Sequence, residues 1–526
     1  MGIYLNQDNT MMYNSKTYSK IYIDKSMLID FTNGNLFGEN KAVCISRPRR
    51  FGKSMAANML VAYYSRGCDS RELFSDLKIA KTANFMKHLN KYNVIHLTMT
   101  DYSKLSVDEM VQKITRILRK DLLSENPDME FADEEDLVLM LLEVFNKTKI
   151  PFIFVIDEWD CIMRKKENNE SIHVEYLDFL RNLLKDQPYV ALTYLTGILP
   201  VKKYGEHSAL NMFKEYSMEN QYELSEFTGF TKEEVEGLCE RFHGDFLQTK
   251  KWYNGYWLGG MSIYNPRSVV SAMENRAYES YWTKTETYEA LKKYILINMD
   301  GLKAKVQLMI AGEQVPVNTD KFQNDMIHLN SADDVLTLLI HLGYLTYDNV
   351  RKVCWIPNKE VEKEFINCID DEKDWSMVMN AIQNSEECLQ ATLNGDAETV
   401  ARIVEQTHQE NTSIIKYNDE NSLACIVTLS YYTAKNQYEI IRELPSGKGY
   451  ADIAFLPRKN ESLPAIVVEL KSEQSESIAL EQIKKREYSE KISGFSGEII
   501  LVGINYSTEK GAEYKHHTCV IEKIMK

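Results

Sequence analysis

The stretch Ala42-Val-Cys-Ile-Ser-Arg-Pro-Arg-Arg-Phe-Gly-Lys-Ser54 decides the fold of the N-terminal half. Its first five residues form a near-continuous apolar run of the kind found in strands that are buried on both faces. A tight polar turn follows at Pro48–Gly52, and Lys53–Tyr64 is typical of a helix. A strand, a turn that ends in glycine and a helix together form the unit from which phosphate-binding loops are built.

The turn ends in Gly52-Lys53-Ser54, which matches the end of the phosphate-loop pattern GxxxxGK[ST]. In that pattern backbone N–H groups hold phosphate oxygens, Lys53 reaches the β and γ phosphates, and the Ser54 hydroxyl binds Mg²⁺. The first glycine of the pattern falls at position 47, where this chain has arginine. A bare GKS is common by chance, so the loop alone leaves nucleotide binding and a structural turn equally open.

A second element favours nucleotide binding. The apolar run Pro151–Ile156 is followed at once by Asp157 and Glu158, and the carboxyl end of a buried strand is where an α/β sheet binds its ligand. We expect Asp157 to hold Mg²⁺ through water and Glu158 to polarise the attacking water. The alternative is an acid that caps a helix after a strand. The order of the two elements along the chain makes that alternative less attractive.

Further strands and helices alternate in this region, which predicts an α/β fold with a parallel sheet. The other strands are expected at Val94–Met99 and Val190–Thr196, with helices such as Val107–Leu123 and Asp136–Asn146. Thr196 either senses the γ-phosphate or is a turn residue at a strand end. Three arginines could stabilise phosphate charge or be ordinary surface or structural residues: Arg49, Arg50 and Arg267.

The middle of the chain, residues 216–375, is mainly helical, with segments at Lys232–Phe242, Tyr288–Asn298 and Asp333–His341. A short hairpin is expected after the last of them, with strands near Gly343–Tyr347 and Val353–Ile356. A winged-helix shape and a plain helical lid both fit this pattern. The predicted domains are therefore 1–215 (P-loop NTPase sheet), 216–375 (lid), 376–415 (helical linker) and 416–526 (a second α/β domain).

The last domain has the order helix, three strands, helix, strand. Its elements are expected at Glu420–Thr433, Tyr438–Glu443, Tyr450–Leu456, Ala465–Lys471, Ser477–Ser489 and Glu498–Ile504.

The composition predicts a cytoplasmic protein. The N-terminus lacks an apolar signal core, and no apolar run is long enough to cross a bilayer, so no membrane partner is expected. Nine cysteines without a CxxC pair indicate reduced thiols. The 62 Lys and Arg against 77 Asp and Glu give a net charge of −15. This argues against a protein coated in basic surface, although a local basic groove remains open.

Several motifs resemble the AAA-ATPase-like family of bacterial proteins. They are Tyr22-Ile-Asp-Lys-Ser26, Arg47-Pro-Arg-Arg-Phe-Gly-Lys-Ser54, Ile156-Asp-Glu-Trp-Asp160, Leu195-Thr-Gly197, Trp252-Tyr-Asn-Gly-Tyr256 and Tyr264-Asn-Pro-Arg-Ser268. Arginine at the first glycine position is usual in that family, so its presence at position 47 does not count against nucleotide binding. The resemblance implies ATP and Mg²⁺ as cofactors and a C-terminal domain of the PD-(D/E)XK nuclease superfamily. The first part is also similar to STAND-type switch ATPases.

The residues that match the nuclease core are Asp452, Glu469 and Lys471. Glu469 and Lys471 are two apart on one strand and so share a face, which Asp452 can reach from the preceding strand. Two carboxylates suit Mg²⁺ or Mn²⁺, which activates water, and Lys471 would orient or deprotonate that water. The local alternative is an exposed strand face with salt bridges.

The resemblance also implies supporting roles for Glu420, Gln482 and Tyr488. The basic run Lys484–Arg486 could contact phosphates, or it could be a solvated helix face.

Three functions are compatible with the sequence. The first is an ATP-controlled nuclease that acts on nucleic acid, with DNA expected before RNA. The second is a non-catalytic nucleotide switch whose C-terminal domain binds nucleic acid or a protein without cleaving it. The third is a motor that works on DNA, which needs a ring. The oligomeric state, a homo-oligomer included, is left open.

Overall fold

The computed structural model describes residues 2–166, 169–201, 210–219, 223–282, 288–297, 299–323, 329–370, 372, 375–411, 426–446, 449–458, 463–472, 497–507 and 516–525. The chain divides into two compact units. The first unit comprises Met1–Leu291 and Pro316–Glu362, and the second comprises Lys292–Val315 and Lys363–Lys526. Each unit is described separately below.

The first unit is built on a five-stranded sheet with the order β2-β3-β4-β1-β5, in which every pair of neighbours is parallel. The strands are β1 (Ala42–Ser46), β2 (Asn93–Thr98), β3 (Phe152–Asp157), β4 (Val190–Gly197) and β5 (Lys214–Tyr216). The predicted parallel α/β sheet is therefore confirmed, and four strands lie within a residue or so of their expected bounds. The edge strand β5 has the sequence Lys-Glu-Tyr, which is too short and polar to give an apolar-strand signal.

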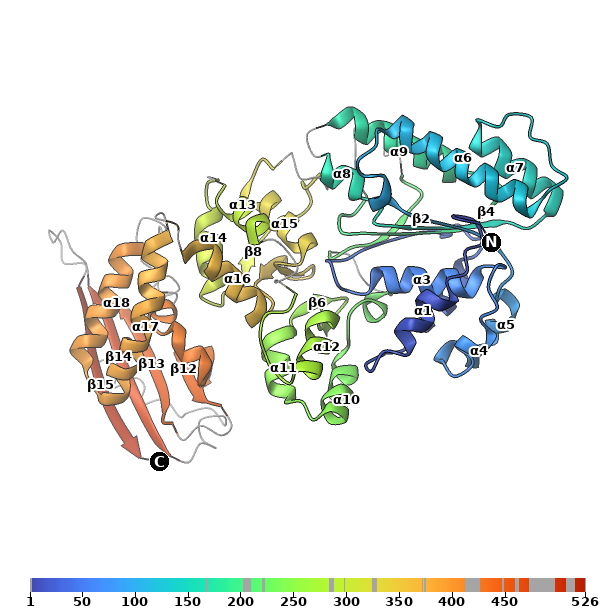
Figure 1. Cartoon of the computed structure of the whole chain (residues 1–526). Helices are drawn as coiled ribbons and strands as arrows, with labels where there is room; N and C mark the ends of the chain where they lie inside the picture. Colours follow the sequence, from blue (N-terminus) through green and yellow to red (C-terminus); the bar gives the residue numbers. More distant parts are fainter. Residues whose placement is uncertain are drawn as a thin grey trace. The chain divides into compact units, whose positions relative to one another are not determined.

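Helices cover both faces of this sheet (Figure 1). One face packs against α6 (Val107–Glu125), α7 (Leu137–Thr148), α8 (Cys161–Lys165) and α9 (Glu170–Leu184). The other face packs against α1 (Thr10–Thr17), α2 (Met27–Asn35), α3 (Lys53–Tyr64), α4 (Arg71–Phe74) and α5 (Phe85–His88). Capping boxes define helix starts, as at Ser106 and Glu109 in α6.

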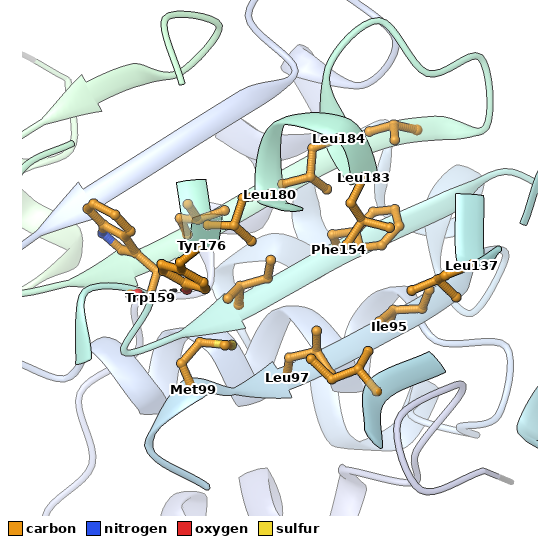
Figure 2. Close-up of a cluster of buried hydrophobic side chains, with 14 of the residues drawn as sticks. Ile95, Leu97, Met99, Leu137, Phe154, Trp159, Tyr176, Leu180, Leu183 and Leu184 are labelled. Atoms are coloured by element: carbon orange, nitrogen blue, oxygen red, sulfur yellow. Dashed lines mark hydrogen bonds between the residues drawn. The ribbon is translucent and has the colours of Figure 1, made fainter. Parts of the chain in front are cut away.

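The hydrophobic core between the sheet and helices α6 to α9 extends to the acidic pair Asp157 and Glu158 (Figure 2). Phe154 of β3 packs with the leucines of α9, and Trp159, just past the strand, is fully buried. The Tyr176 hydroxyl donates to the Trp159 carbonyl oxygen at 2.8 Å. This packing fixes the backbone directly after Asp157 and Glu158.

The middle region is helical, as predicted. Its elements in the first unit include α10 (Lys232–Phe242), α11 (Phe246–Tyr253), the hairpin β6 (Tyr256–Leu258) and β7 (Met261–Ile263), α12 (Pro266–Asn275) and α15 (Ala332–Leu342). The predicted hairpin after α15 is present as β9 (Thr346–Asp348) and β10 (Val353–Trp355), which are antiparallel. Three elements cross the boundary between the units: α13 (Tyr288–Ile295), β8 (Val315–Pro316) and α16 (Lys359–Asp370).

The second unit contains α14 (Leu302–Ile310), α17 (Ser376–Asn394), α18 (Ala397–Asn411) and a mixed sheet with the order β11-β12-β13-β14-β15. The strands are β11 (Tyr438–Ser446), β12 (Gly449–Pro457), β13 (Ala465–Ser472), β14 (Glu498–Ser507) and β15 (His516–Met525). Only β13 and β14 are parallel. The last strand, β15, was not expected, because its sequence His-His-Thr-Cys-Val-Ile-Glu-Lys-Ile-Met mixes polar and apolar residues.

The sequence predicts a linker over 376–415, and the structure places α17 and α18 there. Both helices lie on one face of the sheet (Figure 1) and contribute Cys388, Leu389, Val400, Ile403 and Val404 to its core. Their polar residues lie on the outer faces, which explains why the segment has the composition of a linker. Within the predicted helix Glu420–Thr433, residues 426–430 are helical, while the part before 426 and the predicted helix Ser477–Ser489 lie outside the described residues.

Candidate functional site

The loop between β1 and α3 has the backbone geometry of a phosphate cradle. Gly52 is the N-cap of α3 and has φ +89°, which L side chains rarely adopt. Because glycine carries no capping side chain, the first N–H groups of α3 are left for a ligand. Arg50 also has a positive φ, of 68°. Positive φ at a non-glycine residue is costly and is concentrated at functional sites.

Lys53 is buried beside this loop, with 5% of its surface exposed. Its ammonium Nζ donates to the carbonyl oxygens of Arg47 and Pro48, at 3.0 Å each. Burial lowers the pKa of Lys53, and the carboxylate of Glu158 is the strongest influence in the opposite direction. The lysine is thus a buried charge that the loop carbonyls solvate in place of water.

Arg47, at the first glycine position of the pattern, is a structural residue. Its side chain is fully buried and donates to the carbonyl oxygens of Ser46 and Tyr216, at 2.8 and 2.7 Å, and to the Thr228 hydroxyl at 2.8 Å. Burial lowers the pKa of Arg47 to about 9. The arginine therefore ties the start of the loop to the end of β5 and to the segment that enters the middle region.

We expect Arg47→Gly, which restores the common motif, to destabilise the first unit rather than improve it. The substitution removes at least three hydrogen bonds from a charged group and adds backbone freedom to the unfolded chain, a loss of about 2–4 kcal/mol. Urea unfolding monitored by tryptophan fluorescence measures the effect. Arg47→Lys, which keeps the charge but not the planar fork, should recover only part of it. Equal stability of Arg47→Gly and the wild type would contradict this role.

The acids after β3 occupy different environments. Asp157 is 5% exposed, and its Oδ1 accepts hydrogen bonds from the Thr196 hydroxyl and from the Glu158 N–H. Glu158 has φ 54°, and its carboxylate forms an ion pair with Arg164. Thr196, for which a γ-phosphate sensor and a strand-end turn residue were both open, donates to Asp157 and thus orients that carboxylate.

Asp160 and Arg164 belong to the same cluster, and sequence reasoning gave them no role. Asp160 is fully buried, and its Oδ2 accepts from the N–H groups of Ile198 and Leu199 at 3.0 and 2.9 Å. It also accepts from Arg164 Nε at 2.8 Å. Arg164 therefore bridges Asp160 and Glu158 and links both acids to the turn after β4. The sequence carried a signal for this cluster. Asp160 lies three residues after Asp157, and Arg164 lies one helical turn after Asp160.

A cavity of about 490 Å³ lies beside the phosphate loop. Its polar lining includes Arg49, Arg50, the Gly52–Ser54 segment and Glu158, whereas Asp157, Asp160, Arg164 and Thr196 are not among the lining residues. The apolar lining consists of Ile21, Tyr22, Ile23, Met55, Ala56, Met59, Phe227, Phe230, Pro266 and Val270, with Lys25 and Arg267 also present. The cavity therefore brings the Tyr22–Ser26 motif and the start of α12 to the phosphate loop. A cavity lined by both charged and apolar groups fits a ligand that has both characters.

The C-terminal candidates lie on two paired strands. The register pairs Ile453 of β12 with Val468 of β13, and continuing it by one residue sets positions 452 and 469 opposite each other. Glu469 is fully buried, in a sheet whose neighbouring positions are Ala465, Val467 and Leu501. A carboxylate in such surroundings is costly unless it binds a positive charge. For Asp452 and Lys471 the structure describes the backbone, within β12 and β13.

Asn505 is a further polar residue at this place and was not predicted. It is 5% exposed and stands opposite Lys471 in the parallel β13–β14 register. The carboxyl ends of two parallel strands thus bring Glu469, Lys471 and Asn505 to one edge of the sheet. The supporting candidates Glu420, Gln482 and Tyr488 lie outside the described residues.

Comparisons with known proteins match both ends of the chain. Residues 12–205 match the family described as "Predicted AAA-ATPase", and residues 418–515 match the PD-(D/E)XK nuclease superfamily. The resemblance inferred from the sequence motifs is confirmed. A relative from Azotobacter chroococcum mcd 1, described as an uncharacterized protein in the vnfD 5' region, is 24% identical over 330 residues. The match covers 59% of this chain and 58% of that protein, so the chain spans little more than half of the relative's length.

Similar solved structures include Cdc6p from Pyrobaculum aerophilum, with 12% identity and a TM-score of 0.28, covering 69% of this chain and 98% of that one. The ORC2 protein of Aeropyrum pernix has 10% identity and a TM-score of 0.31, covering 68% of this chain and 98% of the other.

Within the described residues, no helix has the length and apolar character that crossing a bilayer requires.

Proposed function

We propose that the first unit binds ATP with Mg²⁺. The observation that carries the proposal is the cavity that the Gly52–Ser54 segment and Glu158 line together with a set of apolar side chains. A triphosphate suits the phosphate loop, and a purine base suits the apolar side chains. The two carbonyl contacts of Lys53 would be exchanged for phosphate oxygens, whose negative charge compensates the buried ammonium.

The residues around the cavity then take distinct roles. Ser54, which lines the cavity, and Asp157 would hold Mg²⁺, which would neutralise phosphate charge. Glu158 would accept a proton from the attacking water once it is free of Arg164. Arg49 and Arg50 are exposed at the loop, and Arg267 lines the cavity from α12, so all three can approach phosphate charge.

We propose that the second unit cleaves phosphodiester bonds of nucleic acid, with DNA as the preferred class. Asp452 and Glu469 would hold Mg²⁺ or Mn²⁺, which supplies an activated water and neutralises phosphate charge. Lys471 would steady the negative charge that develops as the water oxygen bonds to phosphorus and the leaving oxygen departs. The burial of Glu469 and the register of β12 with β13 support this assignment.

We propose further that the nucleotide controls cleavage. The alternative remains a switch whose second unit binds nucleic acid or a protein without cutting. Purified full-length protein should be incubated with Mg²⁺ or Mn²⁺ and single-stranded DNA, duplex DNA or RNA, with and without ATP. Cleavage that depends on ATP supports the control. Cleavage at the same rate with and without ATP contradicts nucleotide control but not the nuclease activity. Failure to cleave any of the substrates favours the non-catalytic switch.

We expect Thr196→Val to separate nucleotide binding from Mg²⁺-dependent hydrolysis. Valine keeps the shape of threonine but removes the hydroxyl that donates to Asp157. The kcat for ATP hydrolysis should fall about tenfold, roughly 1.4 kcal/mol of barrier, while the Kd measured without Mg²⁺ stays within about threefold. Thr193→Val, on the same strand and also buried, is the matched control. Equal kcat values for the two variants would contradict the role of the Thr196 hydroxyl.

A further inference from the structure

Glu360, in the first turn of α16, is a buried junction of hydrogen bonds. It is 1% exposed. Its Oε2 accepts from the Ser268 hydroxyl at 2.7 Å, and its Oε1 accepts from the N–H groups of Tyr281 and Trp282 at 2.5 and 2.6 Å. Hydrogen bonds to a carboxylate in a low-dielectric interior are strong and fix the geometry of the groups that they join.

One branch of this junction leads to the phosphate loop. The Trp282 side chain is 1% exposed, and its indole Nε1 donates to the Arg49 carbonyl oxygen at 3.1 Å. Gly343 packs closely against Pro48 of the same loop, because a Cβ added at position 343 would lie 2.6 Å from the Pro48 side chain. The loop that would hold the triphosphate is therefore in direct contact with Trp282.

The other branch leads to the opposite wall of the cavity. Ser268 lies in the first turn of α12, and its neighbours Pro266, Arg267 and Val270 line the cavity. The Ser268 side chain is fully buried, so bulk water does not compete for its hydrogen bond to Glu360. A single carboxylate thus holds the phosphate loop, through Trp282, and the wall that carries Arg267.

Glu360 lies on a helix that continues from the first unit into the second. Helix α16 runs without interruption from Lys359 to Asp370, while the first unit ends at Glu362 and the second unit resumes at Lys363. A helix is a stiff element, so a displacement of its first turn is transmitted along its length. The first turn of α16, which holds Glu360, thus belongs to the first unit, and the rest of the helix belongs to the second.

We infer that Glu360 is a positioning residue that couples both walls of the nucleotide cavity to helix α16. The inference rests on the proposed nucleotide binding and adds the route by which the bound state reaches the second unit. A ligand that draws Arg267 and the phosphate loop together changes the positions of Ser268 and Trp282. Glu360 follows both of them, because its two oxygens are each bonded to one branch.

Hydrogen–deuterium exchange of the full chain, with and without ATP and Mg²⁺, tests the coupling. The readout is the exchange of the second half of α16 (Lys363–Asp370) and of α17. Trp282→Phe removes the indole donor to Arg49, and Ser268→Ala removes the hydroxyl donor to Glu360. Trp355→Phe is the matched control, since Trp355 lies in β10 of the same unit and is not part of the junction.

In the wild type and in Trp355→Phe, ATP should change the exchange of these two helices. In Trp282→Phe and Ser268→Ala, the exchange response at saturating ATP should fall by half or more, while the ATP Kd of Ser268→Ala should stay within about threefold of the wild type. Thermal melting confirms that each variant is folded, and Ser268→Ala is the milder change. An unchanged response in both variants, or an absent response in a wild type that binds ATP, overturns the inference. A wild type that binds no nucleotide overturns the proposed function instead.

Discussion

Lys53→Met is expected to lower the affinity for ATP by at least about 100-fold, roughly 2.7 kcal/mol, and to leave the fold as stable as before or more stable. The affinity falls because the ammonium is the buried positive charge nearest the phosphate cradle and has two hydrogen bonds to exchange for phosphate oxygens. The stability is kept because methionine fills a similar volume and relieves the burial that lowers the pKa of Lys53.

Titration with a fluorescent ATP analogue measures the first effect, and urea unfolding without nucleotide measures the second. Lys41→Met is the matched control. Lys41 also donates to a backbone carbonyl, that of Val190 at 3.0 Å, and burial also lowers its pKa. The control should bind ATP like the wild type. If Lys53→Met binds ATP with wild-type affinity, the loop is not the phosphate site.

Glu469→Gln is expected to reduce metal-dependent cleavage by at least about 1,000-fold, since divalent-metal catalysis contributes several kcal/mol to the barrier. Glutamine has the shape of glutamate but lacks the charge that holds the cation. A thermal melt without metal shows whether Glu469→Gln is folded, which separates a lost site from a damaged fold.

The assay is cleavage of labelled DNA over a range of Mn²⁺ concentrations. Glu439→Gln on the exposed surface of β11 is the control and should cleave like the wild type. Asp452→Asn should behave like Glu469→Gln, because the two positions face each other across the register. Cleavage that survives in Glu469→Gln would place the active centre elsewhere.

The parts of the fold that could be predicted from the sequence are those that local pattern determines. The apolar runs of β1 and β3 and the alternation with amphipathic helices give the parallel sheet directly. The outer strands β5 and β15 have mixed sequences, and their pairing depends on a neighbour far along the chain. Helices α17 and α18 have a linker-like composition because only one narrow face of each is apolar, and only the core of the second unit reveals their place.

The candidate sites divide in the same way. Lys53, Asp157 and Glu158 could be placed because motif and strand end coincide in the sequence. The partners that organise them could not, because their contacts are tertiary: Thr196 is 39 residues from Asp157, and Trp282 is 233 residues from Arg49. Arg47 is the clearest example. The sequence shows only that the motif lacks its first glycine, whereas the contacts show that the arginine side chain anchors the start of the phosphate loop.

That anchor makes position 47 energetically dependent on a distant position. Arg47 donates to the Tyr216 carbonyl oxygen and to the Thr228 hydroxyl, 181 residues downstream. Glycine at position 47 would leave a void and would remove the donor from both acceptors. Because Thr228 contributes a side-chain hydroxyl, whereas Tyr216 contributes a backbone carbonyl, substitutions at positions 47 and 228 should have non-additive effects on the free energy of unfolding.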